Sequence, residues 1–475
     1  MNKLYKNWGY LLFSNVFTTG ISFFAFIFLA KKLSPDGYGA FNTLIATATL
    51  FAAFANNIVA GTVINREIVL KPTTGKHLFK KAILLRTLGF VVASISLVVY
   101  NYFTDKNEGV ILASLIALLL SNVVWELCEQ IAFGYFITKI TTLLKIFVSV
   151  IWLVVVITVP LEYSTVTVLF VLYTAIMLII SICYWWIDKN KLLVDKNNEN
   201  SGVSTKQLVR MSTPYLWMRI LGAFGDQIPI LLLNGYSGAA QVAYYSVGSK
   251  FVLPITLMIN TGISALFPFL TKLYKEDIES YKKKIAIGFA FVLIFGATAA
   301  AFFTATSSYW LVWIMGERYL DSVEAFNYQV WFAVCLGFDL ILAMVLSSSY
   351  RQKTLAIITT IDIVILLPIL LLAMPYGAKG VAIAKLISAL ISVIYHVFVV
   401  IFALKIKLNN SMFYLSCSYF VILLSITMLT TQLWMKIGLY VIVIFVYMCF
   451  KNSPLRSIIA LIKDKLKSMN RGEEH

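Results

Sequence analysis

The stretch LLFSNVFTTGISFFAFIFLA, residues 11–30, decides the class of this protein, because it is twenty residues long and contains no charged side chain. A helix needs about 20 mainly apolar residues to cross the hydrocarbon core of a bilayer. Lys31-Lys32-Leu33-Ser34-Pro35 follows the run, where a signal peptide would have a small-residue cleavage site. We therefore interpret the run as a first membrane helix that the protein retains.

The rest of the chain repeats this pattern. Of its 475 residues, 60% are hydrophobic and only 13% are charged, which is far from the composition of a soluble protein. Charges gather between the apolar runs, since a charge at the centre of a membrane helix costs about 2.5–3.5 kcal/mol on insertion scales. The runs are too long for barrel strands, and a helix satisfies its own backbone polar groups. We predict an all-α integral membrane protein.

The apolar runs predict about fourteen transmembrane helices in two six-helix lobes, with two further helices at the C-terminus. We place the spans near 9–30, 40–61, 82–101, 109–133, 142–160, 165–187, 211–233, 240–266, 285–304, 326–347, 354–373, 380–404, 411–430 and 432–450. The longest polar interval, 188–210, is interpreted as a cytoplasmic linker between an N-lobe at 1–187 and a C-lobe at 211–404. Residues 405–475 then hold the last two helices and a basic cytoplasmic tail.

Lys and Arg residues gather in alternate loops. Those near 66–86, 189–210 and 272–284 collect most of them, together with the tail from Lys451. Because positive charge stays on the cytoplasmic side, we expect both termini in the cytoplasm. The formal charge of +17 is explained by this topology and by attraction to anionic lipid headgroups, so nucleic-acid binding need not be invoked.

The two lobes share loop patterns. Residues 33–42 and 236–248 are both small-residue loops that lead through Tyr into a helix, and Pro160 and Pro375 recur at the outer end of the fifth helix of each lobe. A repeat of this kind implies a pseudo-twofold axis along the membrane normal and a cavity between the lobes. The alternative is that Pro and Gly simply mark loop ends.

Three segments resemble the polysaccharide-exporter branch, the Wzx-type oligosaccharide flippases, of the multidrug/oligosaccharidyl-lipid/polysaccharide (MOP) flippase superfamily. They are Leu33-Ser-Pro-Asp-Gly-Tyr-Gly-Ala-Phe41, Trp313-Ile-Met-Gly-Glu-Arg-Tyr319 and Gly377-Ala-Lys-Gly-Val-Ala-Ile-Ala384. Each is weak alone. Their order and helix positions, across about 400 residues, make them specific for the family but not for its cargo.

The resemblance implies a flippase that moves a polyprenyl-pyrophosphate-linked oligosaccharide from the cytoplasmic to the external leaflet of the bacterial cytoplasmic (inner) membrane, by alternating access. It also implies membrane lipids, a glycan polymerase and glycosyltransferases as partners. Coupling to H⁺ or Na⁺ stays open. No cofactor is implied, and the five scattered cysteines and three distant histidines predict no metal site.

Cations at membrane depth are the candidates for contact with an anionic substrate. The main ones are Arg219 and Lys250, since a guanidinium can donate two hydrogen bonds to a phosphate and an ammonium adds a point charge. Further substrate-binding candidates are Asp226, Arg66, Arg86 and Lys385. Arg66 and Arg86 can equally be read as ordinary cytoplasmic anchors.

Acids inside the predicted helices are candidates for ion coupling or for ion pairs. They are Glu126, Glu129, Asp339 and Asp362. Glu126 and Glu129 share a helix face and could pair with Arg219 or Lys250 across the lobes, or take up H⁺ or Na⁺. The alternative for each acid is a buried pair that only fixes helix packing. His396, near the end of an apolar run, is interpreted as an interfacial side chain.

Three other functions compete with the flippase. A cation-coupled multidrug antiporter of the same superfamily would need acids for cationic drugs, and the first helix has none, although Glu126, Glu129 and Asp226 keep this reading open. A peptidoglycan-precursor flippase is a close alternative. An enzyme acting on the same lipid is disfavoured, because the largest external segment, 305–325, is short and mostly apolar and no catalytic motif is present.

Overall fold

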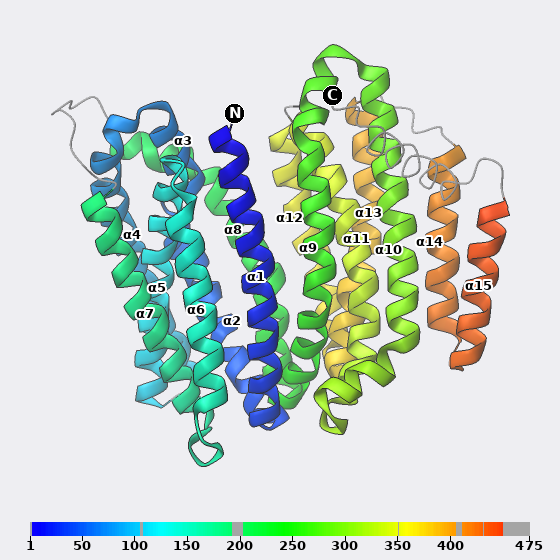
Figure 1. Cartoon of the computed structure of the whole chain (residues 1–475), viewed down its shortest axis with the longest axis horizontal. Coiled ribbons are helices and arrows are strands. Elements are labelled where there is room, and N and C mark those ends of the chain that lie inside the picture. The colour runs from blue at the N-terminus through cyan, green and yellow to red at the C-terminus, as the bar shows by residue number, and fades with distance from the viewer. Residues whose placement is uncertain are drawn as a thin grey trace. The chain divides into compact units, whose positions relative to one another are not determined.

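The computed structural model describes residues 2–104, 108–191, 203–349, 351–404, 411–430 and 432–449. These residues form helices joined by short turns, and none of the described residues lies in a β-strand (Figure 1). The basic tail and the middle of the predicted linker, at 192–202, lie outside them.

Eight helices make up most of the first half of the chain. They are α1 (Asn2–Lys32), α2 (Pro35–Asn57), α3 (Gly61–Leu70), α4 (Gly75–Thr104), α5 (Gly109–Gly134), α6 (Thr138–Thr158), α7 (Val166–Lys191) and α8 (Thr205–Ser237). Seven follow in the second half: α9 (Ala239–Glu276), α10 (Ile278–Met315), α11 (Ser322–Ser348), α12 (Gln352–Ala373), α13 (Gly377–Leu404), α14 (Ser411–Leu429) and α15 (Leu433–Cys449).

Each predicted span has its own helix, and the predicted fold class is confirmed. The span predicted at 40–61 is the one that differs, because the chain breaks at its C-terminal end and continues as the short helix α3. Among the described residues, nine segments are long and apolar enough to cross a membrane, one of which, Lys353–Phe402, contains most of α12 and α13. Two shorter apolar helices, Tyr414–Leu429 and Leu433–Tyr447, follow. The protein is therefore a multi-pass membrane protein.

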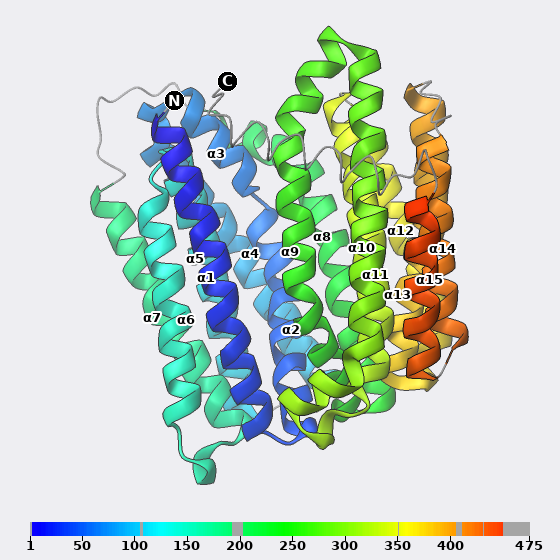
Figure 2. The ribbon, with the colours of Figure 1, turned by 45° about the vertical axis from the view of Figure 1, so that its right-hand side comes forward.

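Contacts divide the chain into two compact units, Met1–Ala243 and Tyr244–His475. In the first unit, α2 packs against α4, α5 and α8, and α5 packs along α7. In the second unit, α11 lies between α10 and α13, while α12 packs on α13. Helices α14 and α15, orange and red in Figure 2, lie beside α10. The predicted boundary at 188–210 stays a prediction, since α8 belongs here with the first unit.

The three segments that carry the family resemblance turn out to be structural. In the first, Ser34 caps α2 by accepting a 3.1 Å hydrogen bond from the Gly37 backbone N–H, and Pro35 begins the helix. In the second, Gly316 adopts φ +90°, a left-handed conformation that favours glycine. Gly377 opens the third with φ +63°. These residues fix how helices start and turn, which explains why the segments report the fold rather than the cargo.

Gly39 shows why the first segment needs its second glycine. A Cβ at this position would lie 1.7 Å from the backbone oxygen of Ala239 and 3.1 Å from the backbone nitrogen of Ala243. The two loops that suggested an internal repeat therefore meet here, inside the first unit, at backbone-to-backbone distance.

We expect Gly39→Ala to lower the free energy of unfolding by about 1–3 kcal/mol, because backbone cannot move aside as a side chain can. Gly20→Ala is the matched control, since nothing lies within 4 Å of a Cβ at Gly20. Thermal unfolding of both variants in detergent micelles checks the prediction. Equal melting temperatures for the two would contradict it.

Candidate functional site

A group of largely buried ionisable side chains lies in the second unit, where α11, α12 and α13 pack together. Asp339 comes from α11, Asp362 from α12, and Tyr395 and His396 from α13. His396 is 6% exposed, so its ring is removed from solvent and lipid headgroups. We call Asp339, Asp362, Ser392, Tyr395 and His396 the histidine cluster.

His396 stands between the two carboxylates. Its Nδ1 lies 2.9 Å from Oδ1 of Asp339, and its Nε2 lies 3.6 Å from Oδ2 of Asp362. Both distances fall within ion-pair range. One imidazole thus connects acids on two different helices, and an imidazolium can donate from both of its ring nitrogens.

Two hydroxyl groups from α13 also bind the carboxylate of Asp362. Ser392 and Tyr395 both donate short hydrogen bonds to its Oδ1, and Ser392 Oγ also lies 3.4 Å from His396 Nε2. Donors aimed at a carboxylate stabilise its charged form. These two donors therefore favour the ionised form of Asp362, whereas Asp339 is contacted by His396.

Asp339 and Asp362 were predicted as possible ion sites, and the structure brings them together through a residue that sequence reasoning missed. The interpretation of His396 as an interfacial side chain is wrong, because it is buried in the helix packing. A signal was present. Lys385, Ser388, Ser392 and His396 recur at helical spacing along one otherwise apolar run, and all four are buried.

The first unit contains a different charged group, centred on Arg86 of α4. Arg86 is completely buried, and its Nη1 lies 2.5 Å from Oε2 of Glu126 on α5. Its Nε and Nη2 also donate to the backbone oxygen of Val59, at 3.2 and 2.9 Å. The guanidinium therefore lies where the chain leaves α2 and starts α3. It donates to the Val59 carbonyl, which in a continuous helix would have accepted a hydrogen bond from a backbone N–H.

Other predicted acids and cations have local partners. Glu129 pairs with Lys145 of α6 at 2.5 Å. Arg66 is half exposed and pairs with its neighbour Glu67 at 3.0 Å. Glu126 and Glu129 thus have cationic partners within the first unit. In this structure Arg86 serves the helix break and does not line an open vestibule.

The residues predicted to contact substrate lie in different surroundings. Arg219 and Asp226 are both exposed on α8, in the first unit, and Lys250 is exposed on α9, in the second. Lys385 is 9% exposed, and its Nζ lies 5.2 Å from the ring centroid of Phe332 on α11, in a cation–π contact. Arg219 and Lys250 are thus the accessible candidates, whereas Lys385 is part of the packing of the second unit.

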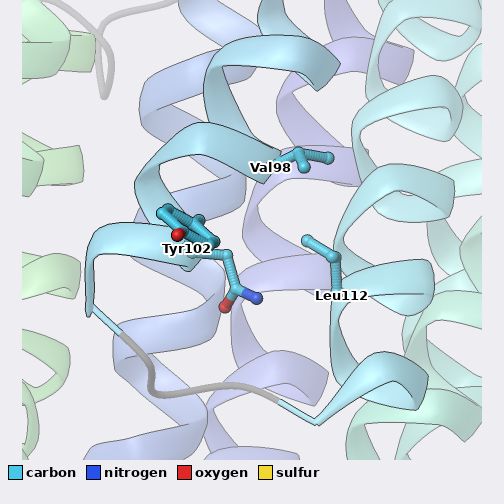
Figure 3. A pocket seen from close by; sticks show the side chains of 4 residues that line it. Val98, Tyr102 and Leu112 are labelled. Carbon is cyan, nitrogen blue, oxygen red and sulfur yellow. The ribbon is translucent and has the colours of Figure 1, made fainter.

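A pocket of about 480 Å³ opens between the end of α4 and the start of α5. Figure 3 shows Val98 and Tyr102 on one side and Leu112 on the other; Asn101 completes the lining. Among the described residues no charged side chain lines it, and Arg86 lies roughly 18 Å or more away along α4. This pocket therefore lies apart from the charged group around Arg86.

The fold resembles that of solved transporters of the MOP superfamily. The lipid II flippase MurJ, in its inward closed conformation, matches with a TM-score of 0.66 at 14% identity, over 94% of this chain and 99% of that chain. A mutant of the Vibrio cholerae MATE transporter VcmN matches with a TM-score of 0.59 at 16% identity, over 87% of this chain and 98% of that one. An inward-facing MATE transporter gives the same TM-score and identity over 82% and 95%.

The bundle of membrane helices thus has the fold of MOP-type transporters. Residues 4–274 match the family described as "Polysaccharide biosynthesis protein", and the chain belongs to that family. No curated protein sequence matches the chain. The resemblance seen in the three loop segments is thereby confirmed.

Proposed function

We propose that this protein is a flippase that carries a polyprenyl-pyrophosphate-linked oligosaccharide from the cytoplasmic to the external leaflet of the bacterial inner membrane. The observation that carries the proposal is the combination of a polysaccharide biosynthesis family match with a transporter fold. The MurJ and MATE folds alone would suit several cargoes. The family match favours a glycan over a cationic drug.

The physical task fits such a protein. A glycan cannot enter hydrocarbon, whereas a polyprenyl tail can stay in lipid while the polar head passes through protein. The pyrophosphate carries about two negative charges, and an inside-negative potential favours its outward movement by about 2.3 kcal/mol per charge per 100 mV. Both termini lie in the cytoplasm in this proposal, in keeping with the lysine and arginine distribution.

Arg219 and Lys250 contact the anionic head in this proposal. Both are exposed cations on helices that otherwise read as membrane spans, and an intramembrane cation is costly unless it has a function or a partner. The acids of the histidine cluster supply the ion coupling. A glycan polymerase and glycosyltransferases would act after and before the transport step.

The leaflet distribution of the lipid-linked glycan tests the proposal. In a strain lacking the gene, we expect the glycan-lipid to accumulate in the cytoplasmic leaflet, protected in intact spheroplasts from a membrane-impermeant oxidant such as periodate. Permeabilising the membrane should expose it, and restoring the gene should return it to the external leaflet.

Three outcomes would count against the flippase. An unchanged leaflet distribution in the deletion strain would remove the proposal. Greater sensitivity to cationic drugs with normal surface glycan would favour a multidrug antiporter. Loss of the glycan-lipid itself, rather than its retention inside, would point to synthesis instead of transport.

A further inference from the structure

The histidine cluster combines two carboxyl groups, an imidazole and a phenol inside a membrane bundle. With a neutral imidazole and two carboxylates its charge is −2, and each proton that binds makes it less negative by one. Burial of uncompensated charge is unfavourable, and the cost falls as protons bind. Burial of the cluster therefore favours the binding of protons to it.

The geometry also links the proton to helix packing. A neutral imidazole has one donor nitrogen and one acceptor nitrogen, so it can donate to only one of the two acids. The other nitrogen would then present a lone pair toward a second carboxylate. Only the imidazolium stabilises both contacts, 2.9 Å to Asp339 and 3.6 Å to Asp362. Protonation of His396 thus lets one ring bridge α13 to both α11 and α12, and loss of the proton removes one of the two ring contacts.

The surroundings of His396 favour a proton over a metal cation. The titratable groups facing it are Asp339 from α11, Asp362 from α12 and Tyr395 from its own helix, with Cys335 one turn before Asp339. Lys385, the cation on the same helix, lies roughly 16 Å away along the axis. The imidazole stands between the carboxylates, where a hard cation would need several oxygen ligands. Within the part of the chain that the structure describes, no group of three or more His, Cys, Asp or Glu side chains is arranged to hold a metal ion.

We propose that His396, held between Asp339 and Asp362, is the proton-binding group that couples this transporter to the proton gradient. In this proposal Ser392 relays the proton between Nε2 of the ring and Asp362. One proton from water forms an N–H bond on the neutral ring, and the same bond breaks when the proton leaves to water on the other side. This inference rests on the proposed transport function and names its coupling ion.

Proton binding can be measured without knowing the cargo. The chain has only three histidines, so ¹⁵N-histidine NMR of the full-length protein in micelles can follow each ring, with His77→Gln and His396→Gln assigning the signals. We expect the His396 ring to pass between the imidazolium and the neutral imidazole during a pH titration, and its signals to be unaffected when KCl replaces NaCl. A His396 ring that keeps one protonation state, or that Na⁺ displaces, would overturn the proposal.

Export in cells supplies the second arm. With comparable amounts of inserted protein, His396→Gln should lower surface glycan about tenfold or more, a change that lies within the usual range of coupling energies. The control His77→Gln changes an exposed histidine on α4 and should leave surface glycan unchanged. If His396→Gln fails to insert, Asp339→Asn keeps the shape and removes one carboxylate, and the same loss is expected. Normal export by an inserted variant would refute proton coupling at this site.

The two proposals fail differently. If the cargo assignment is wrong, the deletion strain shows normal glycan distribution while His396 still titrates in the purified protein. If only the coupling assignment is wrong, the deletion strain retains glycan inside and the histidine variants export normally.

Discussion

Replacing Arg86 with methionine should lower the free energy of unfolding by up to about 3–5 kcal/mol, because it leaves the partly buried Glu126 carboxylate, whose Oε2 is buried, without its cation. The same change removes the two donors to the Val59 oxygen at the break between α2 and α3. The effect is large because Arg86 is completely buried, so water cannot take its place. Denaturant unfolding of the purified protein in micelles measures the loss.

A double variant separates the two contributions. Arg86→Met with Glu126→Met removes both charges, so the penalty for an unpaired carboxylate should disappear and about 1–3 kcal/mol should remain for the unsatisfied carbonyl of Val59. Lys379→Ala is the control, because its pair with Glu324 is exposed on both sides and should be worth no more than about 1 kcal/mol. A loss from Arg86→Met no larger than this control would show that the buried pair contributes little.

Replacing Arg219 with alanine should lower glycan export about ten- to a hundredfold while the protein still inserts. A charged hydrogen bond is worth about 1.5–3 kcal/mol, and each 1.4 kcal/mol corresponds to a factor of ten. Lys250→Ala should act in the same direction. Arg219→Lys should recover only part of the activity, because an ammonium cannot make the paired hydrogen bonds of a guanidinium.

The control for Arg219 lies on the same helix. Arg210 is also exposed on α8 but falls in the basic segment predicted to be cytoplasmic, so Arg210→Ala should leave export close to normal. Surface glycan per inserted protein is the quantity to compare. Normal export by both Arg219→Ala and Lys250→Ala would exclude them as substrate contacts, without changing the expected behaviour of the deletion strain.

The class of protein, the helices and the family could be predicted from the sequence. Lipid imposes a local requirement on every window of about 20 residues, so runs such as 11–30 can be recognised without knowledge of any other part of the chain. Gly316 and Gly377, in two of the three loop segments, report conformations that few other residues adopt, and these too are local. The exception was the second span, where the break before α3 depends on a side chain from α4.

The partners of the charges were decided by the tertiary structure alone. His396 and Asp339 lie 57 residues apart in sequence, and whether they meet depends on how α11 and α13 are rotated and paired. Glu126 faces Arg86 for the same reason. Hydropathy specifies that a segment crosses the membrane but says nothing about which neighbour its few polar side chains will face, because that is fixed by packing between helices that are distant in the chain.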